Sequence, residues 1–276
     1  MRAMSLALQM LSGLTRAFGS NPPSRVKALH LPPVPWTGGK DGEFGAIELE
    51  SGALGLSYLL LDDTLVHIGG TGAGVQGAQP LELARQWVDG PSSARRALGF
   101  AAVNALSREL FDRAGFVPPA AADSIGGLDP QPGASIGMVG FFPPLVKQVV
   151  ARGARLTVLE LRADLAGPRD GCTVTLDPQD LAGCTQVLCT STVLLNHTLE
   201  FVRRACAAAE RFVLIGPGAG CLPDALFEQG VTALAGTWIV DGPAFTQAMA
   251  TGASWSATSR KFLLQRDDYA GLAGRP

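Results

Sequence analysis

The chain has 276 residues, 47% of them hydrophobic, which is enough for one large core or two smaller ones, and the length favours two domains. The formal charge is −2, and the 22 basic and 24 acidic residues are mixed without a run of either sign, which argues against a nucleic-acid or membrane surface. Neither a secretory signal nor a membrane-spanning segment is expected, and five cysteines without a CxxC pair, in apolar surroundings, predict reduced, mostly buried thiols in a cytoplasmic protein.

The first part of the chain predicts a small antiparallel sheet. Residues 6–18 have the spacing of a helix that packs on one face, and residues 25–31 form an extended run before a proline-rich connector. Residues 42–61 predict a hairpin with its tight turn at Ser51-Gly52. The short apolar run at residues 65–68 is interpreted as one more strand.

The most glycine-dense stretch, Gly69 to Gly77, follows. Its Gly70-x-Gly72-x-Gly74 pattern could wrap an anion with backbone N–H groups, and a surface loop is the alternative because no strand and helix frame it. Helices are expected at residues 81–88 and 92–111, and the second carries Asn104 among small apolar residues. An asparagine on a packed helix face needs a partner, so Asn104 is predicted either to make a structural hydrogen bond or to face a ligand.

A polar, glycine- and proline-rich linker at residues 123–133 separates two predicted domains, an α+β domain at residues 1–122 and an α/β domain at residues 134–276. In the second domain, continuous apolar runs alternate with helical segments, which is typical of a doubly wound, Rossmann-like parallel sheet. The expected strands are 136–141, 156–161, 187–190, 212–215 and 231–240, and the expected helices are 143–152, 196–210, 224–229 and 243–249.

The loops at the carboxyl ends of parallel strands are where such folds bind ligands. The first of these loops keeps Gly140 but has phenylalanine and proline where a dinucleotide would need glycines, which argues against classical NAD binding. Glu160, which ends the second strand, is either a ribose-binding acid or a solvated carboxylate.

The later loops offer more polar groups. Residues 190–192 are three hydroxyl residues in a row, and with Asn196 they exceed what a helix cap needs, although capping alone explains Asn196. Residues 216–218 and Gly236 allow a ligand to approach the backbone closely. The residues predicted to contact a ligand are Gly140, Phe141, Phe142, Pro143, Glu160, Thr190, Ser191, Thr192, Asn196, Gly216, Pro217, Gly218 and Gly236.

Four residues are candidate catalytic groups, namely Asn104, Asn196, His197 and Cys221. Cys221 lies on a glycine-rich loop next to a helix start that would lower the pKa of its thiol, and a structural thiol is the alternative. His197 is the only histidine of the second half and could act as a base or a ligand.

The motifs GMVGFFPPLV, CTSTVLLNHTLE, IGPGAG and ALAGTWIVD together resemble the family of heavy-metal chelation domains, long catalogued as a domain of unknown function. The motifs ELESGALGLSY and ARRALGFAAVNAL are similar to the companion domain that precedes it. The resemblance spans most of residues 25–261. It implies an enolase amino-terminal-like domain joined to a Rossmann-like domain, with the site in the cleft between them.

The resemblance also implies a transition-metal ion. The candidate ligands are Cys189, His197, Cys221 and Glu160, which come from different loops and lack metal-ligand spacing. We therefore expect a protein that binds a metal ion, a metal chelate or a polar small molecule between its domains. An enzyme acting on a polar small molecule, such as a lyase or transferase, and a non-catalytic ligand-gated interaction module are the alternatives. A homodimer is expected, because the helix at residues 6–18 and Trp36 need cover.

Overall fold

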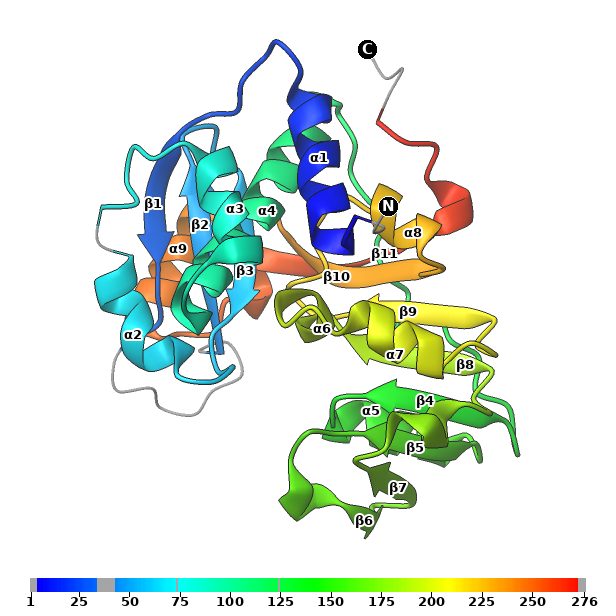
Figure 1. Cartoon of the computed structure of the whole chain (residues 1–276). Helices are drawn as coiled ribbons and strands as arrows, with labels where there is room; N and C mark the ends of the chain where they lie inside the picture. Colours follow the sequence, from blue (N-terminus) through cyan, green and yellow to red (C-terminus); the bar gives the residue numbers. More distant parts are fainter. Residues whose placement is uncertain (1–3, 34–42, 73, 124, 273–276) are drawn as a thin grey trace.

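The computed structural model describes residues 4–33, 43–72, 74–123 and 125–272. Two sheets organise the chain, a three-stranded antiparallel sheet and an eight-stranded, mostly parallel sheet (Figure 1). The predicted fold class, a Rossmann-like α/β unit preceded by a smaller α+β unit, is confirmed. The exact boundaries at residues 1–122, 123–133 and 134–276 remain a prediction, and Trp36 lies outside the described residues. None of the described helices is long and apolar enough to cross a membrane.

The small sheet has the order β1-β2-β3, and the last two strands form the predicted hairpin. Gly52 has a φ of 86°, a left-handed conformation that favours glycine, and it makes the tight turn between Glu48 and Leu54, the last paired residues. Because β3 is an edge strand, its outer backbone groups are not paired with another strand of this sheet. The strands are β1 (Val26–His30), β2 (Phe44–Leu49) and β3 (Leu54–Tyr58).

Four helices accompany this sheet, and one of them corrects the sequence analysis. The strand predicted at residues 65–68 is wrong, because these residues belong to α2, in which Thr64 and Ile68, one helical turn apart, are the buried positions. Gly70 continues this helix and Gly72 also has helical backbone angles, so neither belongs to an extended loop. The helices are α1 (Leu6–Phe18), α2 (Thr64–Thr71), α3 (Pro80–Asp89) and α4 (Ser93–Arg113).

The amphipathic helix α1 matches its predicted bounds. Its apolar face is covered within the chain, since α1 packs on α3, α4 and the helix α8 (Asp224–Glu228) of the second half. The helix therefore no longer argues for a homodimer, which stays a prediction.

The large sheet has the order β11-β10-β9-β8-β4-β5-β7-β6. From β4 the chain adds β5 and β7 on one side and then returns to add β8, β9 and β10 on the other, all parallel, which is the strand order of dinucleotide-binding folds. The order reverses between β4 and β8. The strands are β4 (Ser135–Val139), β5 (Arg155–Leu159), β6 (Gly167–Arg169), β7 (Cys172–Thr175), β8 (Gln186–Thr190), β9 (Arg211–Ile215), β10 (Ala233–Ile239) and β11 (Ser259–Gln265).

All five predicted strands of this sheet are confirmed, whereas β6, β7 and β11 were missed. The helix predicted at residues 196–210 is shorter than expected and occupies residues 199–205. His197, with a left-handed φ of 59°, separates it from a short helix at residues 192–195 that was not predicted. The α-helices are α5 (Pro143–Ala151), α6 (Thr192–Leu195), α7 (Leu199–Ala205), α8 and α9 (Gly242–Thr251), and short 3-10 turns occupy Ala163–Leu165, Pro178–Leu181, Ser256–Thr258 and Arg266–Asp268.

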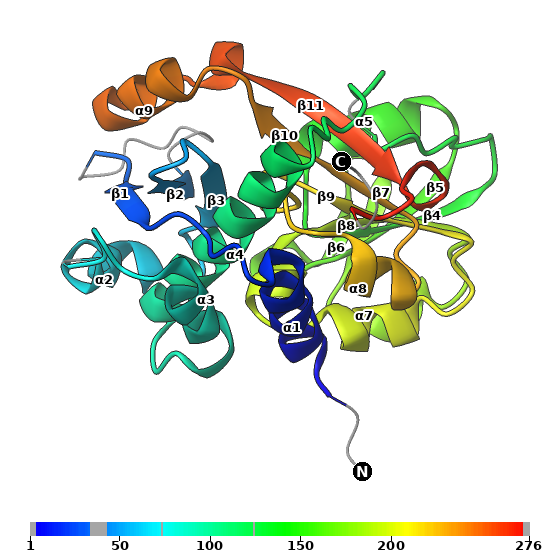
Figure 2. The same cartoon turned by 90° about the horizontal axis from the view of Figure 1, so that it is seen from above.

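The two sheets are joined by elements that cross between them. Figure 2 shows α9, which follows β10, lying over the small sheet, where Phe245 packs with Leu54 and Leu56 of β3. On the other side α4 fills the space between the two sheets, and most of its 21 residues are buried. The core is thus continuous from one sheet to the other.

Small residues let α4 approach its neighbours at backbone distance. A Cβ added at Gly55 of β3 would overlap the backbone of Ala101 and Ala105, and one added at Gly99 would overlap the backbone of Trp87. These two glycines fix where β3 and α3 contact the helix.

Replacing Gly55 by alanine should therefore be strongly destabilising. The new methyl group meets backbone atoms that cannot rotate away, so we expect the free energy of unfolding to fall by about 3 kcal/mol in urea denaturation. Gly13→Ala in the middle of α1 is the matched control, because nothing lies within 4 Å of its added Cβ, and it should gain up to about 1 kcal/mol. Equal effects of the two substitutions would contradict this account of the α4 contact.

Candidate functional site

Three of the predicted loops meet at one edge of the large sheet. We call residues 140–142, 190–192 and 216–218 the switch-point loops, because they leave the carboxyl ends of β4, β8 and β9 around the reversal of strand order. Gly140 turns with a φ of 87°, and a Cβ at this position would lie 3.4 Å from the Cβ of Thr190. The first two loops are therefore in contact.

The second and third loops pack on each other through Ser191. A Cβ added at Gly216 or Gly218 would lie 3.0 Å from the Oγ of Ser191, whose backbone N–H donates to the carbonyl of Ile215 at 2.8 Å. The Oγ1 of Thr190 donates to the Oγ1 of Thr192 at 3.1 Å. Hydroxyl groups and glycine backbone thus lie side by side, as a site for a polar ligand requires.

Glu160 joins the first loop to the end of β5. Its carboxylate accepts hydrogen bonds from the N–H groups of Phe141 at 2.9 Å, Leu161 at 2.7 Å and Arg162 at 3.3 Å. Both carboxylate oxygens are thus engaged by backbone donors, which favours a positioning role for Glu160 over a ribose-binding or metal-binding one. The pKa of the Tyr58 phenol, at the end of β3, is raised by burial and then by the negative charges of Glu43 and Glu160.

Asn104 reaches the same region from α4. Its Nδ2 donates to the carbonyl of Leu56 on β3 at 2.7 Å and to the carbonyl of Gly218 at 3.2 Å. The side chain is only 3% exposed, and its Oδ1 has no hydrogen-bond partner among the described residues. The predicted structural hydrogen bond therefore exists, and it links the small sheet to a switch-point loop.

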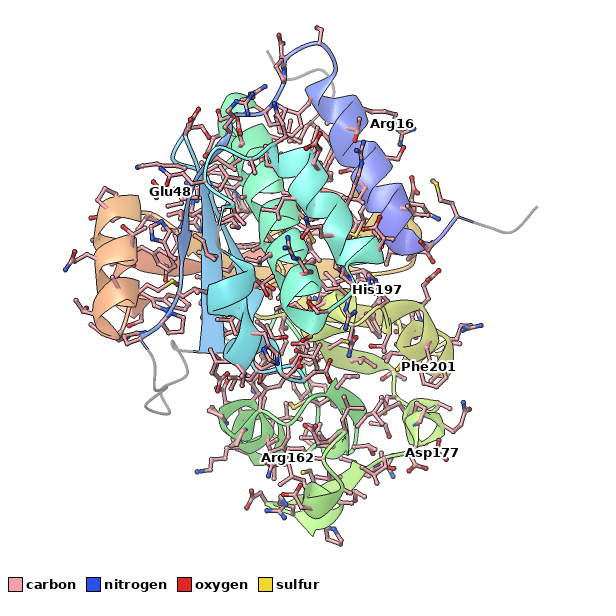
Figure 3. All side chains as sticks on the ribbon, turned by 60° about the vertical axis from the view of Figure 1, so that its left-hand side comes forward. Arg16, Glu48, Arg162, Asp177, His197 and Phe201 are labelled. Carbon is pink, nitrogen blue, oxygen red and sulfur yellow. The ribbon has the colours of Figure 1, made fainter. Side chains whose placement is uncertain are left out.

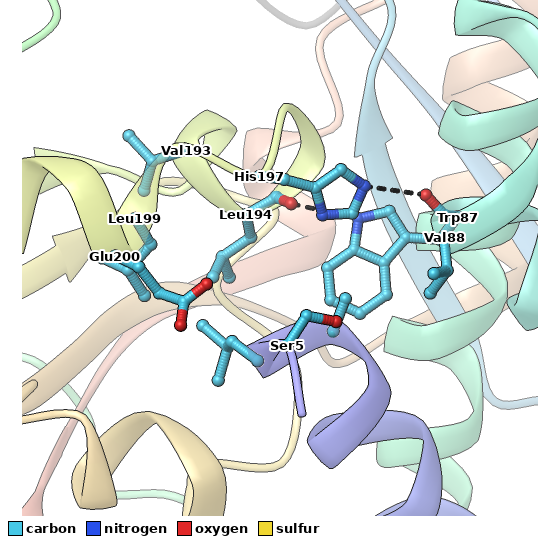
Figure 4. Close-up of a pocket in the computed structure, with 10 residues that line it drawn as sticks. Ser5, Trp87, Val88, Val193, Leu194, His197, Leu199 and Glu200 are labelled. Atoms are coloured by element: carbon cyan, nitrogen blue, oxygen red, sulfur yellow. Dashed lines mark hydrogen bonds between the residues drawn. The ribbon is translucent and has the colours of Figure 1, made fainter. Parts of the chain in front are cut away.

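Two predicted residues lie away from this edge. The Oδ1 of Asn196 accepts hydrogen bonds from the N–H and the hydroxyl of Thr198, so it stabilises the turn between α6 and α7. The Nε2 of His197 is 2.9 Å from the carbonyl oxygen of Trp87, and the two rings stack with centroids 5.3 Å apart (Figure 4). In Figure 3, His197 lies beside α3, well away from Arg162 at the end of β5.

His197 instead lines a cavity of about 200 Å³ between α1, α3 and the α6–α7 turn (Figure 4). The walls are mostly apolar, with the side chains of Ser5 and Glu200 as further polar groups. A second, more open hollow lies next to it on α7, beside Arg203 and Arg204. None of the switch-point loop residues lines either of these two cavities.

The remaining predicted contacts differ in how accessible they are. The space next to Gly236 is occupied by the ring of Phe262, which would lie 2.5 Å from a Cβ at this position. A glycine is needed here for the packing of Phe262. Pro143 is exposed at the first position of α5, and Pro217 is half-buried between the two glycines of its loop.

All five thiols are free and buried, as the sequence predicted for most of them, but the expectation for Cys221 fails. The expected lowering of the pKa of Cys221 is wrong, because this residue is fully buried and burial raises the pKa of its thiol to about 12. The hydroxyl of Ser107 on α4 accepts the N–H of Leu222, which holds the loop against the helix and the Cys221 thiol inside. Cys189 lies within β8, and burial raises its pKa well above the ordinary value.

The candidate metal ligands are not assembled into a metal site. In the described ranges, no group of three or more histidine, cysteine, aspartate or glutamate side chains is placed to hold an ion. The Nε2 of His197 is bonded to a backbone carbonyl, and the thiols of Cys189 and Cys221 are buried in their protonated form. These donors do not fit a bare heavy-metal ion, which prefers clustered thiolate or imidazole ligands.

Two residues near the site were not singled out from the sequence. Ser57 is 1% exposed and its Oγ has no partner among the described residues, and Tyr58 follows it at the end of β3. The strict alternation in LGLSY, which places glycine and serine on the face opposite the large side chains, could have indicated that Ser57 points to a separate, closely packed face.

The comparisons with known proteins identify the family. The family described as "Putative heavy-metal chelation" matches residues 123–266, more than half of the chain. The chain belongs to this family, DUF364. Its companion family DUF4213, which carries the same description, matches residues 43–107. The resemblance expected from the sequence motifs is thus confirmed.

Solved structures of DUF364 proteins share the fold. A protein of unknown function from Desulfitobacterium hafniense DCB-2 superposes with a TM-score of 0.70 at 19% identity, covering 94% of this chain and 98% of that one. A protein of unknown function from Pyrococcus horikoshii gives a TM-score of 0.67 at 19% identity, with 94% and 99% covered. No curated protein matches this chain.

All five thiols are buried, so the native protein should react slowly with a disulfide reagent such as DTNB at neutral pH and rapidly once unfolded in guanidinium chloride. Val66→Cys is the positive control, because this position is 79% exposed and should react at once. Fast labelling of a native cysteine would contradict the burial of these residues.

The same thiols predict a loss of stability at high pH. Burial raises the pKa of Cys206 to about 11 and that of Cys221 to about 12, from 9.0. At a pH below the thiol pKa of the unfolded chain, both the folded and the unfolded state keep these protons, so the buried thiols contribute fully to the free energy of unfolding. Between about pH 9 and pH 12 the thiols of the unfolded chain lose their protons first, and the free energy of unfolding falls. Urea denaturation across this range should show the decline, and Cys221→Ala should make it shallower.

Proposed function

We propose that this DUF364 protein binds a polar small molecule, free or as the organic part of a metal chelate, at the switch-point loops. The observation that carries the proposal is the meeting of three strand-end loops with the amide of Asn104, which comes from the other unit. Open α/β sheets bind ligands where the strand order reverses, and glycine turns let the backbone approach them.

In this proposal a metal ion binds only as part of a chelate, in which the organic molecule supplies the metal ligands. The family description speaks of heavy-metal chelation, yet the groups at the switch-point loops are hydroxyls, an amide and backbone N–H and C=O groups. Such groups recognise the polar atoms of an organic chelator better than a bare soft ion. A bound chelate reconciles the family description with the residues present.

We propose binding rather than catalysis. A nucleophile or base would have to come from Cys221 or His197 in the sequence-based enzyme hypothesis. The Cys221 thiol is buried and stays protonated at neutral pH, and the Nε2 of His197 is bonded to the backbone. The structure gives no reason to favour a ligand-gated interaction module.

Native mass spectrometry and metal analysis of protein purified without a tag test the proposal. We expect an organic molecule or an intact metal complex to co-purify, and Zn²⁺, Ni²⁺ or Cu²⁺ alone to give no saturable rise in Tm. Thr192→Val, which removes a hydroxyl from the second loop, should weaken retention of that molecule. Thr246→Val on α9 is the control, since this threonine is also partly buried but bonds only the carbonyl of Pro243.

Stoichiometric binding of a bare ion without an organic molecule would overturn the proposal. Equal retention by the two threonine variants would place the site elsewhere.

A further inference from the structure

We infer that the ligand presents a hydrogen-bond donor to the Oδ1 of Asn104 and is neutral or positively charged, as an amine, amidine, amide or alcohol is, rather than a carboxylate or phosphate. The inference rests on the proposed function, because it specifies the chemical class of ligand for the same site.

The orientation of the Asn104 amide is fixed by its contacts. Nδ2 donates to the carbonyls of Leu56 and Gly218. A flipped amide would set Oδ1 against two carbonyl oxygens, all of them acceptors, so the flip is excluded by repulsion. The atom that lacks a partner is therefore the amide oxygen, and a neutral amide oxygen can only accept a hydrogen bond. The missing partner must donate.

A second polar group without a partner lies on the same side of β3. Side chains alternate along a strand, so Ser57 points to the same face as Gly55, which packs on α4 with its added Cβ 2.6 Å from the backbone carbon of Asn104. The Oγ of Ser57 has no partner among the described residues, although the residue is 1% exposed. Buried polar groups are almost always paired in the functional state. A ligand that both donates and accepts would satisfy Ser57 and Asn104 together.

The charges around the site disfavour an anion. The three switch-point loops, β3 and residues 98–107 of α4 contain no lysine or arginine. The charged group that the structure fixes at this edge is the carboxylate of Glu160, held by backbone N–H groups. At the start of α5, Pro143 and Pro144 lack the N–H groups that would otherwise attract an anion. An anionic ligand would thus meet this carboxylate, while the nearby guanidinium of Arg162 is already paired with Asp164 at 2.6 Å.

Benzamidine, benzamide and benzoate provide a matched series to test this inference. They share a flat ring that can pack on the half-buried rings of Phe141 and Phe142, and they differ only in the donors and charge of one group. We expect benzamidine and benzamide, but not benzoate, to raise the Tm and to give saturable signals in ligand-observed NMR.

Ser57→Ala distinguishes a binding role from a structural one. Removing a buried hydroxyl without a partner should leave the Tm of the free protein unchanged or higher, while affinity for benzamide falls about threefold to tenfold. Thr64→Val is the control, because the Oγ1 of Thr64 is equally buried and also lacks a partner among the described residues but lies on α2. It should leave affinity unchanged.

Each other outcome has a definite meaning. If benzoate binds as well as or better than the other two, or Ser57→Ala leaves affinity unchanged, the inference falls. If a carboxylate or phosphate co-purifies and is lost in Thr192→Val, the proposed function stands and this inference alone is overturned. If no probe binds and no molecule co-purifies, both fail, and an ordered water is the donor to Asn104.

Discussion

The direct backbone contact of α4 with its neighbours is the constraint on which the rest of the structure depends. Gly55 and Gly99 lack the Cβ atoms that would push β3 and α3 away from the helix. The small side chains of the alanines in α4 also allow this close approach. Asn104 lies on the helix at this contact, and its amide joins a strand of one sheet to a loop of the other. What the small unit contributes to the candidate site is therefore determined by how closely α4 packs.

The proposal of an organic ligand or a metal chelate rests on the chemistry of the residues present, which the family description does not address. Soft metals select thiolate and imidazole ligands, yet the thiols of this chain are buried. The polar groups at the switch-point loops are hydroxyl groups and backbone N–H and C=O groups. A chelator satisfies both requirements, because it supplies the metal ligands itself and offers its outer polar atoms to the protein.

Much of the fold could be predicted from the sequence, and the errors have physical causes. The five central strands are apolar on both faces, so their sequences are easily recognised as strands. By contrast, β6 and β7 have only three and four residues, and the edge strand β11 buries only alternate residues. The run at residues 65–68 is too short for its periodicity to distinguish a helix from a strand. It forms part of α2, whose helical conformation depends on tertiary packing. For the site, topology correctly placed the strand-end loops next to one another. Buried thiols were expected in general, but the choice between a buried and a ligand-facing Cys221 could not be made, because the contact of Leu222 with Ser107 that holds its loop joins residues 115 positions apart.

The position of α9 also constrains how the two sheets can move relative to each other. The chain leaves the large sheet after β10, packs Phe245 and Met249 of α9 against the small sheet, and returns as β11, while α1 makes the reverse connection to α8. A rigid-body rotation that separated the two sheets would expose these side chains to water and break both connections. A ligand bound at the switch-point loops, as proposed, would therefore exchange through local displacement of these loops, with the two units held together. For the same reason, neither half of the chain is a self-contained module that could be transplanted without the other.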